Sequence, residues 1–144
     1  MVAASAIAIF PCTPEHFCAI VSDYERYPEF ISEIKQCRVV RSEGDKKLVE
    51  FHVSGIKTFS YRLWITENPP ERIAWRLESS DLFDTSVGSW SCGAAAGKTQ
   101  AKYSVDVTFK VFVPGLVAQA LMNVNVANTV SAFRRRVEAL LGAR

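Results

Sequence analysis

The sequence lacks a long apolar run and a strong excess of charge of either sign. Its 144 residues contain 17 Lys and Arg against 15 Asp and Glu, a formal charge of +2. That charge is too small for the basic surface that nucleic acids require. No apolar stretch reaches the roughly 18 residues that a membrane-spanning helix needs. We therefore expect neither a nucleic-acid-binding domain nor a transmembrane protein.

Cysteines are few and do not form a metal-binding pattern. The four cysteines, Cys12, Cys18, Cys37 and Cys92, include no Cys-x-x-Cys pair and no histidine at zinc-finger spacing. The first residues lack the charged start of a secretory signal. We expect reduced thiols in a cytoplasmic protein, with disulfides as the alternative. No metal site and no cofactor are predicted.

Patterns that indicate catalysis are also sparse. The two histidines, His16 and His52, are expected on a surface helix and on the polar face of a strand, outside any metal-binding motif. The sequence contains no G-x-S-x-G elbow. Asp81 and Asp84 flank Phe83, but "SSDLFD" is typical of a solvated turn. We assign no catalytic residue.

The order of elements predicts the fold class. Apolar periodicity indicates one strand, two short helices, six strands and one long helix, with Thr13 capping the first helix at Pro14. The strands alternate apolar and polar residues, as antiparallel strands with one packed face do. Strands and helices are segregated, which is typical of α+β proteins. We expect one domain, residues 1–144, with a curved seven-stranded antiparallel sheet wrapped around the C-terminal helix.

The segment "VSDYERYPEFI" concentrates aromatic residues around Pro28. Because Pro28 disfavours helical geometry at the residue before it, we expect a break there and a second short helix at about residues 29–34. Tyr24 is expected outside. Tyr27 and Phe30 either fill the core or form a wall of a pocket, and the sequence leaves both interpretations open.

The long C-terminal helix is predicted to cover a cavity. The stretch of about 27 residues after Pro114, from Gly115 to the stop at Gly142, has no internal proline or glycine, so the helix should be on the order of 40 Å long. Small residues such as Ala118, Ala120 and Ala127 lie in its first half, whereas Phe133 lies in its second half. We expect a cavity under the first half and a packed core under the second. The predicted inner face of the first half consists of Leu116, Val117, Ala120, Leu121, Val124 and Ala127.

Several of these features resemble a known superfamily. The spacing of Asp23, Tyr27, Pro28 and Phe30, the "GSW" at residues 88–90 and the terminal "FRRRVEALLG" are similar to START-like (SRPBCC, helix-grip) proteins, in particular the coenzyme Q-binding and polyketide cyclase-like branch. The resemblance implies a deep hydrophobic cavity for lipids, isoprenoid quinones or polyketide-like molecules. Members of the superfamily range from carriers to cyclases, and some act through protein or ribosome partners.

The expected ligand-binding residues share a position on the inner face of the sheet, in the aromatic segment or in the first half of the long helix. They are Tyr27, Phe30, Tyr61, Leu63, Trp75, Phe83, Trp90, Tyr103, Val105, Leu116, Ala120, Asn123 and Val124.

Three functions remain open. The first is binding or transport of a hydrophobic small molecule, with a transient membrane-surface contact as an option. The second is a polyketide cyclase or aromatase in which Tyr61 and Tyr103 polarise carbonyl groups. The third is an interaction module that uses Arg134 to Arg136 and an exposed Trp64 to bind a ribosome or an unknown protein partner.

Overall fold

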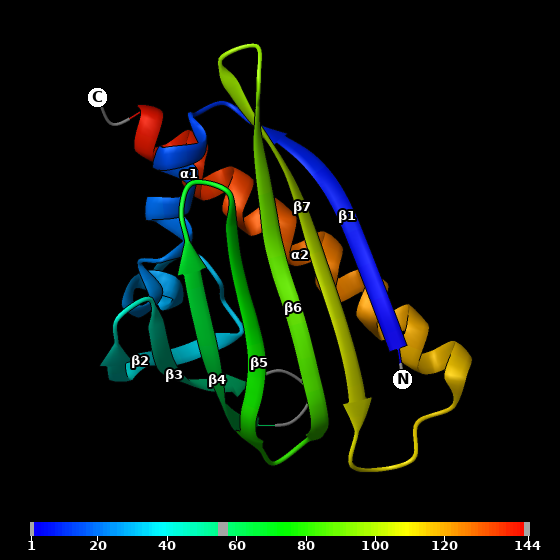
Figure 1. The fold of residues 1–144 in the computed structure, drawn as a ribbon. Coiled ribbons are helices and arrows are strands. Elements are labelled where there is room, and N and C mark those ends of the chain that lie inside the picture. Colours follow the sequence, from blue (N-terminus) through cyan, green and yellow to red (C-terminus); the bar gives the residue numbers. More distant parts are fainter. Residues whose placement is uncertain (1, 55–57, 143–144) are drawn as a thin grey trace.

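Residues 2–54 and 58–142 are described by the structure, a computed structural model. Within them, seven strands form one antiparallel sheet in the order β1-β7-β6-β5-β4-β3-β2 (Figure 1). This confirms the predicted α+β helix-grip architecture. The elements are β1 (Val2–Phe10), α1 (Pro14–Val21), the 3₁₀ helix η1 (Tyr24–Glu29), β2 (Ile34–Glu43), β3 (Lys46–Ser54), β4 (Thr58–Asn68), β5 (Arg72–Ser80), β6 (Phe83–Ala95), β7 (Lys98–Phe109) and α2 (Gly115–Gly142).

Helix α1 begins where the capping pattern predicts. Thr13 accepts a hydrogen bond of 3.2 Å from the backbone N–H of His16, and Pro14 occupies the first helical turn. Proline is tolerated there because the first N–H groups of a helix have no partner inside the helix. The apolar side of α1 is buried, including Phe17 and Val21.

The second short helix lies earlier than predicted. It is η1, Tyr24–Glu29, and not a helix at residues 29–34. A 3₁₀ helix has three residues per turn, so Tyr24 and Tyr27 lie on the same side of it, and both are buried. The expectation that Tyr24 lies outside is therefore wrong. Its hydroxyl donates a hydrogen bond of 2.5 Å to Glu67 Oε2, which joins η1 to the end of β4.

Tyr27 occupies the centre of the contact between η1, the sheet and α2. Its hydroxyl donates a hydrogen bond to the carbonyl oxygen of Val21. Its ring centre lies 5.5 Å from that of Phe133 on α2 and 5.7 Å from that of Phe30. These contacts match the core-filling interpretation of the aromatic segment.

The sheet places its first and last strands side by side. Val2 lies opposite Val107, and Phe10 lies opposite Thr99, along the whole length of the β1–β7 pair. The outer strands of the sheet are thus β1 and β2, and the inner face curves toward α2 (Figure 1).

The packed core lies under the second half of α2, as predicted. Phe133 and Val137 of α2 are buried against Phe17 of α1 and Trp90 of β6. The ring centres of Phe133 and Trp90 are 5.4 Å apart, and those of Phe17 and Trp90 are 5.1 Å apart. Edge-on contacts of this kind stabilise cores beyond their buried area.

The first half of α2 is turned differently from the prediction. Its main contacts with the sheet are with β1 and β7, at one side of the sheet (Figure 1). Only a narrow stripe at i, i+4 and i+8 faces inward, formed by Ala118, Met122 and Val126. The stripe continues through Phe133 and Val137, so the inward side of α2 does not rotate between its halves. The predicted inner face lies on the opposite side of the helix and is exposed to solvent.

No helix in the described part of the chain is both long enough and apolar enough to cross a membrane.

Candidate ligand-binding site

The inner face of the sheet carries a group of half-buried aromatic rings, which we name the inner aromatic wall. It lies on β4 to β7, largely away from the side of the sheet that α2 covers. Its rings keep part of their surface accessible, whereas core rings such as that of Trp90 are fully buried. The wall consists of Phe59, Tyr61, Trp75, Phe83 and Phe109.

Four of these rings form a continuous surface. The ring centre of Phe83 lies 6.0 Å from Phe59, 6.2 Å from Tyr61 and 5.4 Å from Phe109. Tyr61 also stacks on the buried ring of Phe51, with centres 4.9 Å apart. The alternation of side chains along each strand places these residues on one face. The result is an apolar surface that has flat rings and is anchored in the core.

Tyr61 supplies a polar group within this apolar surface. Burial is the main cause that raises the pKa of its phenol, so the hydroxyl is neutral at physiological pH and can donate a hydrogen bond. Within residues 2–54 and 58–142 the hydroxyl has no hydrogen-bond partner. The side chain is nevertheless only half-buried. Tyr61 therefore combines a largely dry environment with an accessible donor.

Tyr103 lies deeper, next to the inner stripe of α2. It is buried, and this burial raises the pKa of its phenol to about 12. A hydrogen bond with Thr129 of α2 partly offsets this rise in pKa. Its ring packs against Trp75 and Trp90, at centre distances of 5.7 and 4.7 Å. Tyr103 thus links the wall to the core.

Gly88 explains how the Trp75 side chain lies against the sheet. Trp75 is opposite Gly88 in the β5–β6 pair. A Cβ atom at Gly88 would lie 2.5 Å from Cε2 of the Trp75 ring and 2.6 Å from the carbonyl oxygen of Ser104. Only a glycine leaves room for the indole here. The "GSW" motif therefore has a structural role, since Gly88 accommodates Trp75 and Trp90 fills the core.

The structure divides the predicted binding residues into three groups. Tyr61, Trp75 and Phe83 belong to the inner aromatic wall. Behind them lie buried residues of the inner face, namely Leu63, Trp90, Tyr103 and Val105, while Tyr27 and the half-buried Phe30 pack at the opposite end of the interior. Phe59 of β4 and Phe109 of β7 also lie on the inner face of the sheet, beside Phe83. The predicted binding residues do not include these two.

The third group, on α2, was placed wrongly. Leu116 and Val124 are 89% and 58% exposed, and Ala120 and Asn123 also face solvent. The helix lies at one side of the sheet, so the face that the prediction turned inward meets no strand. Asn123 Oδ1 accepts a hydrogen bond of 3.0 Å from Gln119 Nε2. The same Nε2 donates to the carbonyl oxygen of Ala3, at 2.9 Å.

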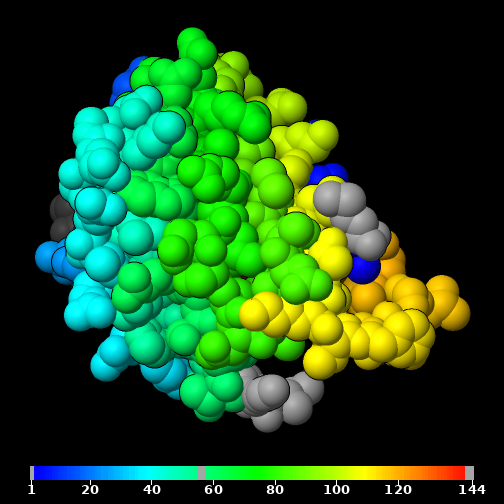
Figure 2. Space-filling model, turned by 60° about the horizontal axis from the view of Figure 1, so that its bottom comes forward, coloured from blue at the N-terminus to red at the C-terminus, as the bar shows by residue number. Residues whose placement is uncertain are grey.

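The exposed side of α2 and the connection before it form a second apolar feature, which we name the α2 outer surface. Phe112 is 91% exposed, and Figure 2 shows the yellow β7–α2 connection projecting from the body of the molecule. No acidic residue occurs from Val107 to Val137, whereas Lys110 and three arginines do. The surface consists of Val111, Phe112, Leu116, Val117, Leu121 and Val124.

The surface of the molecule also has two small hollows. One, of about 210 Å³, lies between α1, η1 and the end of α2 and includes His16, Asp23 and Arg136. The other, of about 150 Å³, includes Glu50, Ser60 and Asp81, and it also reaches Tyr61 of the wall. Both are smaller than the roughly 300 Å³ at which drug-sized ligand pockets begin. Neither lies under the first half of α2, so the cavity predicted there stays a prediction.

The outer face of the sheet carries a charged network around Glu50. Glu50 accepts hydrogen bonds from His52, Arg62 and Arg38, at 3.0, 2.9 and 2.9 Å. These bonds, that of His52 first, hold the pKa of Glu50 down at about 2. The network holds His52 in a hydrogen bond with Glu50 on the solvent side. It holds no nucleophile and faces away from the wall.

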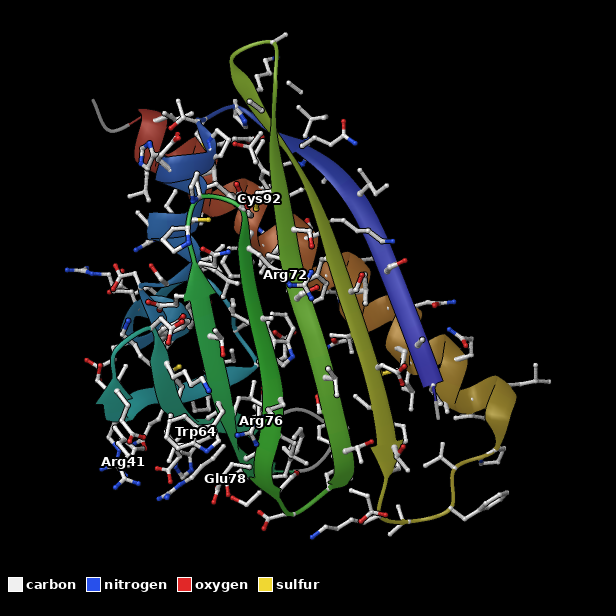
Figure 3. The ribbon with its side chains drawn as sticks, viewed as in Figure 1. Arg41, Trp64, Arg72, Arg76, Glu78 and Cys92 are labelled. Carbon is white, nitrogen blue, oxygen red and sulfur yellow. The ribbon has the colours of Figure 1, made fainter. Side chains whose placement is uncertain are left out.

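Trp64 also lies on this outer face, near Arg41 and Arg76 (Figure 3). It is opposite Leu48 on one side and Arg76 on the other, and it is half-buried. The sequence had predicted an exposed Trp64. Leu48 is itself buried, and the β3–β4 register places it directly beside Trp64 on this face.

The arginine run on α2 is largely occupied by contacts within the protein. Arg136 pairs with Glu29 at 3.0 Å, and its guanidinium lies 5.0 Å from the centre of the Phe30 ring. The guanidinium of Arg134 lies 5.8 Å from the ring centre of Phe10. These contacts dock α2 onto η1 and β1. They weaken the hypothesis that the run serves as a partner-binding patch.

In the part of the chain that the structure describes, no group of three or more His, Cys, Asp or Glu side chains could hold a metal ion.

Comparison with known proteins agrees with this architecture. The family model described as polyketide cyclase / dehydrase and lipid transport matches residues 11–134. A search of curated protein sequences gave no match.

Solved structures with the same fold come from several bacteria. A START superfamily protein from Mycobacterium smegmatis is 24% identical with a TM-score of 0.87, covering 96% of this chain and 98% of that one. The Zhui aromatase/cyclase from Streptomyces sp. R1128 is 13% identical with a TM-score of 0.83, covering 94% and 93%. A STAR-related lipid transfer protein from Xanthomonas axonopodis is 10% identical with a TM-score of 0.78, covering 94% and 85%.

Proposed function

Because the chain belongs to the polyketide cyclase / dehydrase and lipid transport family, we propose that it binds a hydrophobic small molecule on the inner aromatic wall. The observation that carries this proposal is Tyr61, a neutral phenol without a partner among the described residues, set in accessible aromatic surface. Water contact with such rings is unfavourable, and a ligand that displaces that water gains about 25 cal/mol per Å² of apolar area.

The chemistry of the wall favours one class of ligand. Flat rings stack well on planar or conjugated groups. The Tyr61 hydroxyl can donate a hydrogen bond to a carbonyl oxygen. Quinone headgroups and polyketide-like molecules combine both features, whereas a saturated acyl chain offers only apolar area. We therefore place isoprenoid quinones and polyketide-like molecules ahead of simple fatty acids.

We further propose that the α2 outer surface contacts the surface of an anionic membrane, where such ligands reside. Apolar side chains that project from a convex helix and a loop offer no concave site for a protein partner. Lys110 adjoins this surface and no acidic residue occurs from Val107 to Val137, so the local charge is positive and complements anionic lipid headgroups. Large exposed apolar patches on soluble proteins commonly mark interaction sites.

The cytoplasm is the proposed location. All four cysteines are free, and three of them are buried. Free thiols are typical of proteins in a reducing compartment.

Displacement of a fluorescent probe tests ligand binding. The protein is titrated with 1-anilinonaphthalene-8-sulfonate, and a short-chain ubiquinone analogue, a linear polyketide mimic and palmitate then compete for the probe. We expect Phe83→Ala to weaken quinone binding about tenfold, because it removes the ring at the centre of the wall. Tyr61→Phe should weaken quinone binding about fivefold, as loss of one hydrogen bond predicts, and leave palmitate unchanged.

Val87→Ala is the matched control, because Val87 is an apolar side chain that is half exposed on the outer face of β6. Equal affinity of wild type, Phe83→Ala and Val87→Ala for the quinone analogue would contradict binding on the wall.

A second candidate is cyclisation of a reactive polyketide-like chain. It is favoured by two neutral tyrosine hydroxyls on the inner face, at Tyr61 and Tyr103, which can polarise carbonyl oxygens. Turnover of a linear poly-β-ketone thioester, followed by mass spectrometry, is the test. Tyr61→Phe should then slow turnover by at least tenfold while Val87→Ala does not. Binding without turnover in wild type would leave only the carrier function.

A further inference from the structure

Two cysteines far apart in the sequence meet beside the turn between β4 and β5. Cys18 lies on α1 and is 3% exposed, and Cys92 lies near the end of β6 and is half-buried. Cys18 Sγ donates a hydrogen bond of 3.4 Å to the carbonyl oxygen of Pro70. The backbone N–H of Cys92 donates a hydrogen bond of 2.8 Å to the carbonyl oxygen of Glu71, the residue that follows Pro70. One turn therefore contacts both cysteines, and Figure 3 labels Cys92.

The two side chains also share one interface. Cys18 belongs to the buried core cluster, and Cys92 packs against that cluster. Helix α1 packs on β6 and β7, so this contact belongs to the interface between the helix and the sheet. Cys92 is two residues from the buried Trp90 along β6, so its side chain lies on the same inner face of the sheet.

The pKa values of the two thiols are shifted in opposite directions. This is the pattern expected when one cysteine acts as the nucleophile and the other reacts with it afterwards. A hydrogen bond from Cys92 lowers the pKa of Cys18, although burial and the negative charges of Glu15 and Glu67 oppose it. The same contact and burial raise the pKa of Cys92. Burial raises the pKa of Cys37 to about 12, and it also raises the pKa of Cys12. Because the thiolate is the reactive form, Cys18 is the favoured nucleophile of the four.

We propose that Cys18 and Cys92 form a redox-sensitive pair that a peroxide converts into an intramolecular disulfide. The thiolate sulfur of Cys18 attacks one peroxide oxygen; the S–O bond forms, the O–O bond breaks, and the released hydroxide takes up the proton of the original thiol to give water. The Cys92 sulfur then attacks the sulfur of Cys18. The S–S bond forms, the S–O bond breaks, and the leaving hydroxide takes the Cys92 proton. Two thiols are oxidised by two electrons, and the peroxide is reduced to two waters.

The proposal is independent of the inner aromatic wall, since it concerns the opposite end of β6 from Phe83. It adds a modification site that joins α1 to the sheet covalently.

Peroxide treatment of the full-length protein, followed by unfolding and alkylation, tests the proposal. Intact mass should show four alkylated thiols before treatment and two after it, because the chain has four free cysteines. Non-reducing peptide mapping of the wild type should identify the Cys18 peptide joined to the Cys92 peptide. Dithiothreitol should restore all four thiols. The mapping needs no variant and so does not depend on how a variant folds.

Single cysteine variants test which two cysteines form the disulfide. Cys37→Ser and Cys12→Ser should still lose two thiols, whereas Cys18→Ser and Cys92→Ser should lose none to an intramolecular bond. A Cys12–Cys92 link, covalent dimers as the main product, or oxidation to sulfinic acid without any cross-link would each overturn the proposal.

Discussion

Gly88 shows how one residue determines the shape of the inner aromatic wall. Trp75 can lie across β6 only because no side chain projects from the position opposite it. The sequence showed the "GSW" motif and the inward position of Trp75, but it did not show that the glycine accommodates the tryptophan. That relation depends on the pairing register of two strands, which a single sequence does not reveal.

Gly88→Ala should therefore destabilise the protein and disturb the wall. The added methyl group would collide with the indole of Trp75 and with the backbone at Ser104, so one of them must move. We expect a loss of about 1 to 3 kcal/mol in the free energy of unfolding, measured by urea titration. Gly93→Ala is the control, because a Cβ there would meet no atom within 4 Å. Equal loss in both variants would contradict the role given to Gly88.

Glu50 makes stability depend on pH in the acid range. Its pKa is about 2 in the folded protein against an ordinary 4.5, so between these values the unfolded chain binds more protons. Stability should therefore rise with pH from about 2 to 4.5 and lose this contribution as pH falls. The partners are solvated, so we expect about 1 kcal/mol or less.

The measurement is urea unfolding at several pH values from 2 to 5. Glu50→Gln should flatten the pH dependence, whereas Glu43→Gln, which removes a looser exposed pair with Arg41 at 3.8 Å, should not. A wild-type slope retained in Glu50→Gln would show that other carboxyl groups cause it.

At the scale of elements, the sequence predicted which segments are strands and helices better than how they are oriented. Alternation along β4 to β7 placed Tyr61, Trp75 and Tyr103 on the inner face, and the structure agrees. The apolar pattern of α2 predicted a helix, but both sides of its first half are apolar. Periodicity alone therefore could not show that Met122 faces the sheet while Leu121 faces solvent.

The α2 outer surface should bind anionic vesicles. Phe112→Glu combined with Leu116→Glu removes apolar side chains that are 91% and 89% exposed and adds repulsive charge. Burying one large apolar side chain contributes about 1.5 to 3 kcal/mol, so partition onto phosphatidylglycerol vesicles should fall at least tenfold. Co-sedimentation at low and high salt measures the effect.

Ile7→Glu is the control for this prediction, since Ile7 is 63% exposed but lies on the outer face of β1. The membrane proposal fails if Ile7→Glu reduces vesicle binding as much as the double variant, or if the wild type does not bind.

At the scale of the whole molecule, a bound ligand should stabilise the fold. The wall is built from four strands, so a ligand on it holds β4 to β7 together. A ligand at one hundred times its dissociation constant contributes about 2.7 kcal/mol. For a domain of this size, the thermal midpoint should rise by roughly 5 to 10 °C. Differential scanning fluorimetry with the quinone analogue should show this rise in wild type and a smaller one in Phe83→Ala. An identical rise in both would place the ligand elsewhere.

The overall architecture followed from the sequence because it depends on local patterns and their order. Contacts between distant segments did not, and these include the Tyr24–Glu67 hydrogen bond and the meeting of Cys18 with Cys92. Such contacts require the three-dimensional path of the chain. For the same reason, the aromatic segment could not be assigned to the core before Tyr27 was seen against Phe133.

The pairing of β1 with β7 has a consequence for folding during synthesis on the ribosome. Val2 is made well before its partner Val107, because α1, η1 and the strands β2 to β6 lie between them in the chain. A nascent chain must therefore carry β1 without its neighbour until β7 has been synthesised. Long-range pairing of this kind slows folding and exposes strands that aggregate. Truncated products that end before β7 should therefore be the species that chaperones and proteases meet most often.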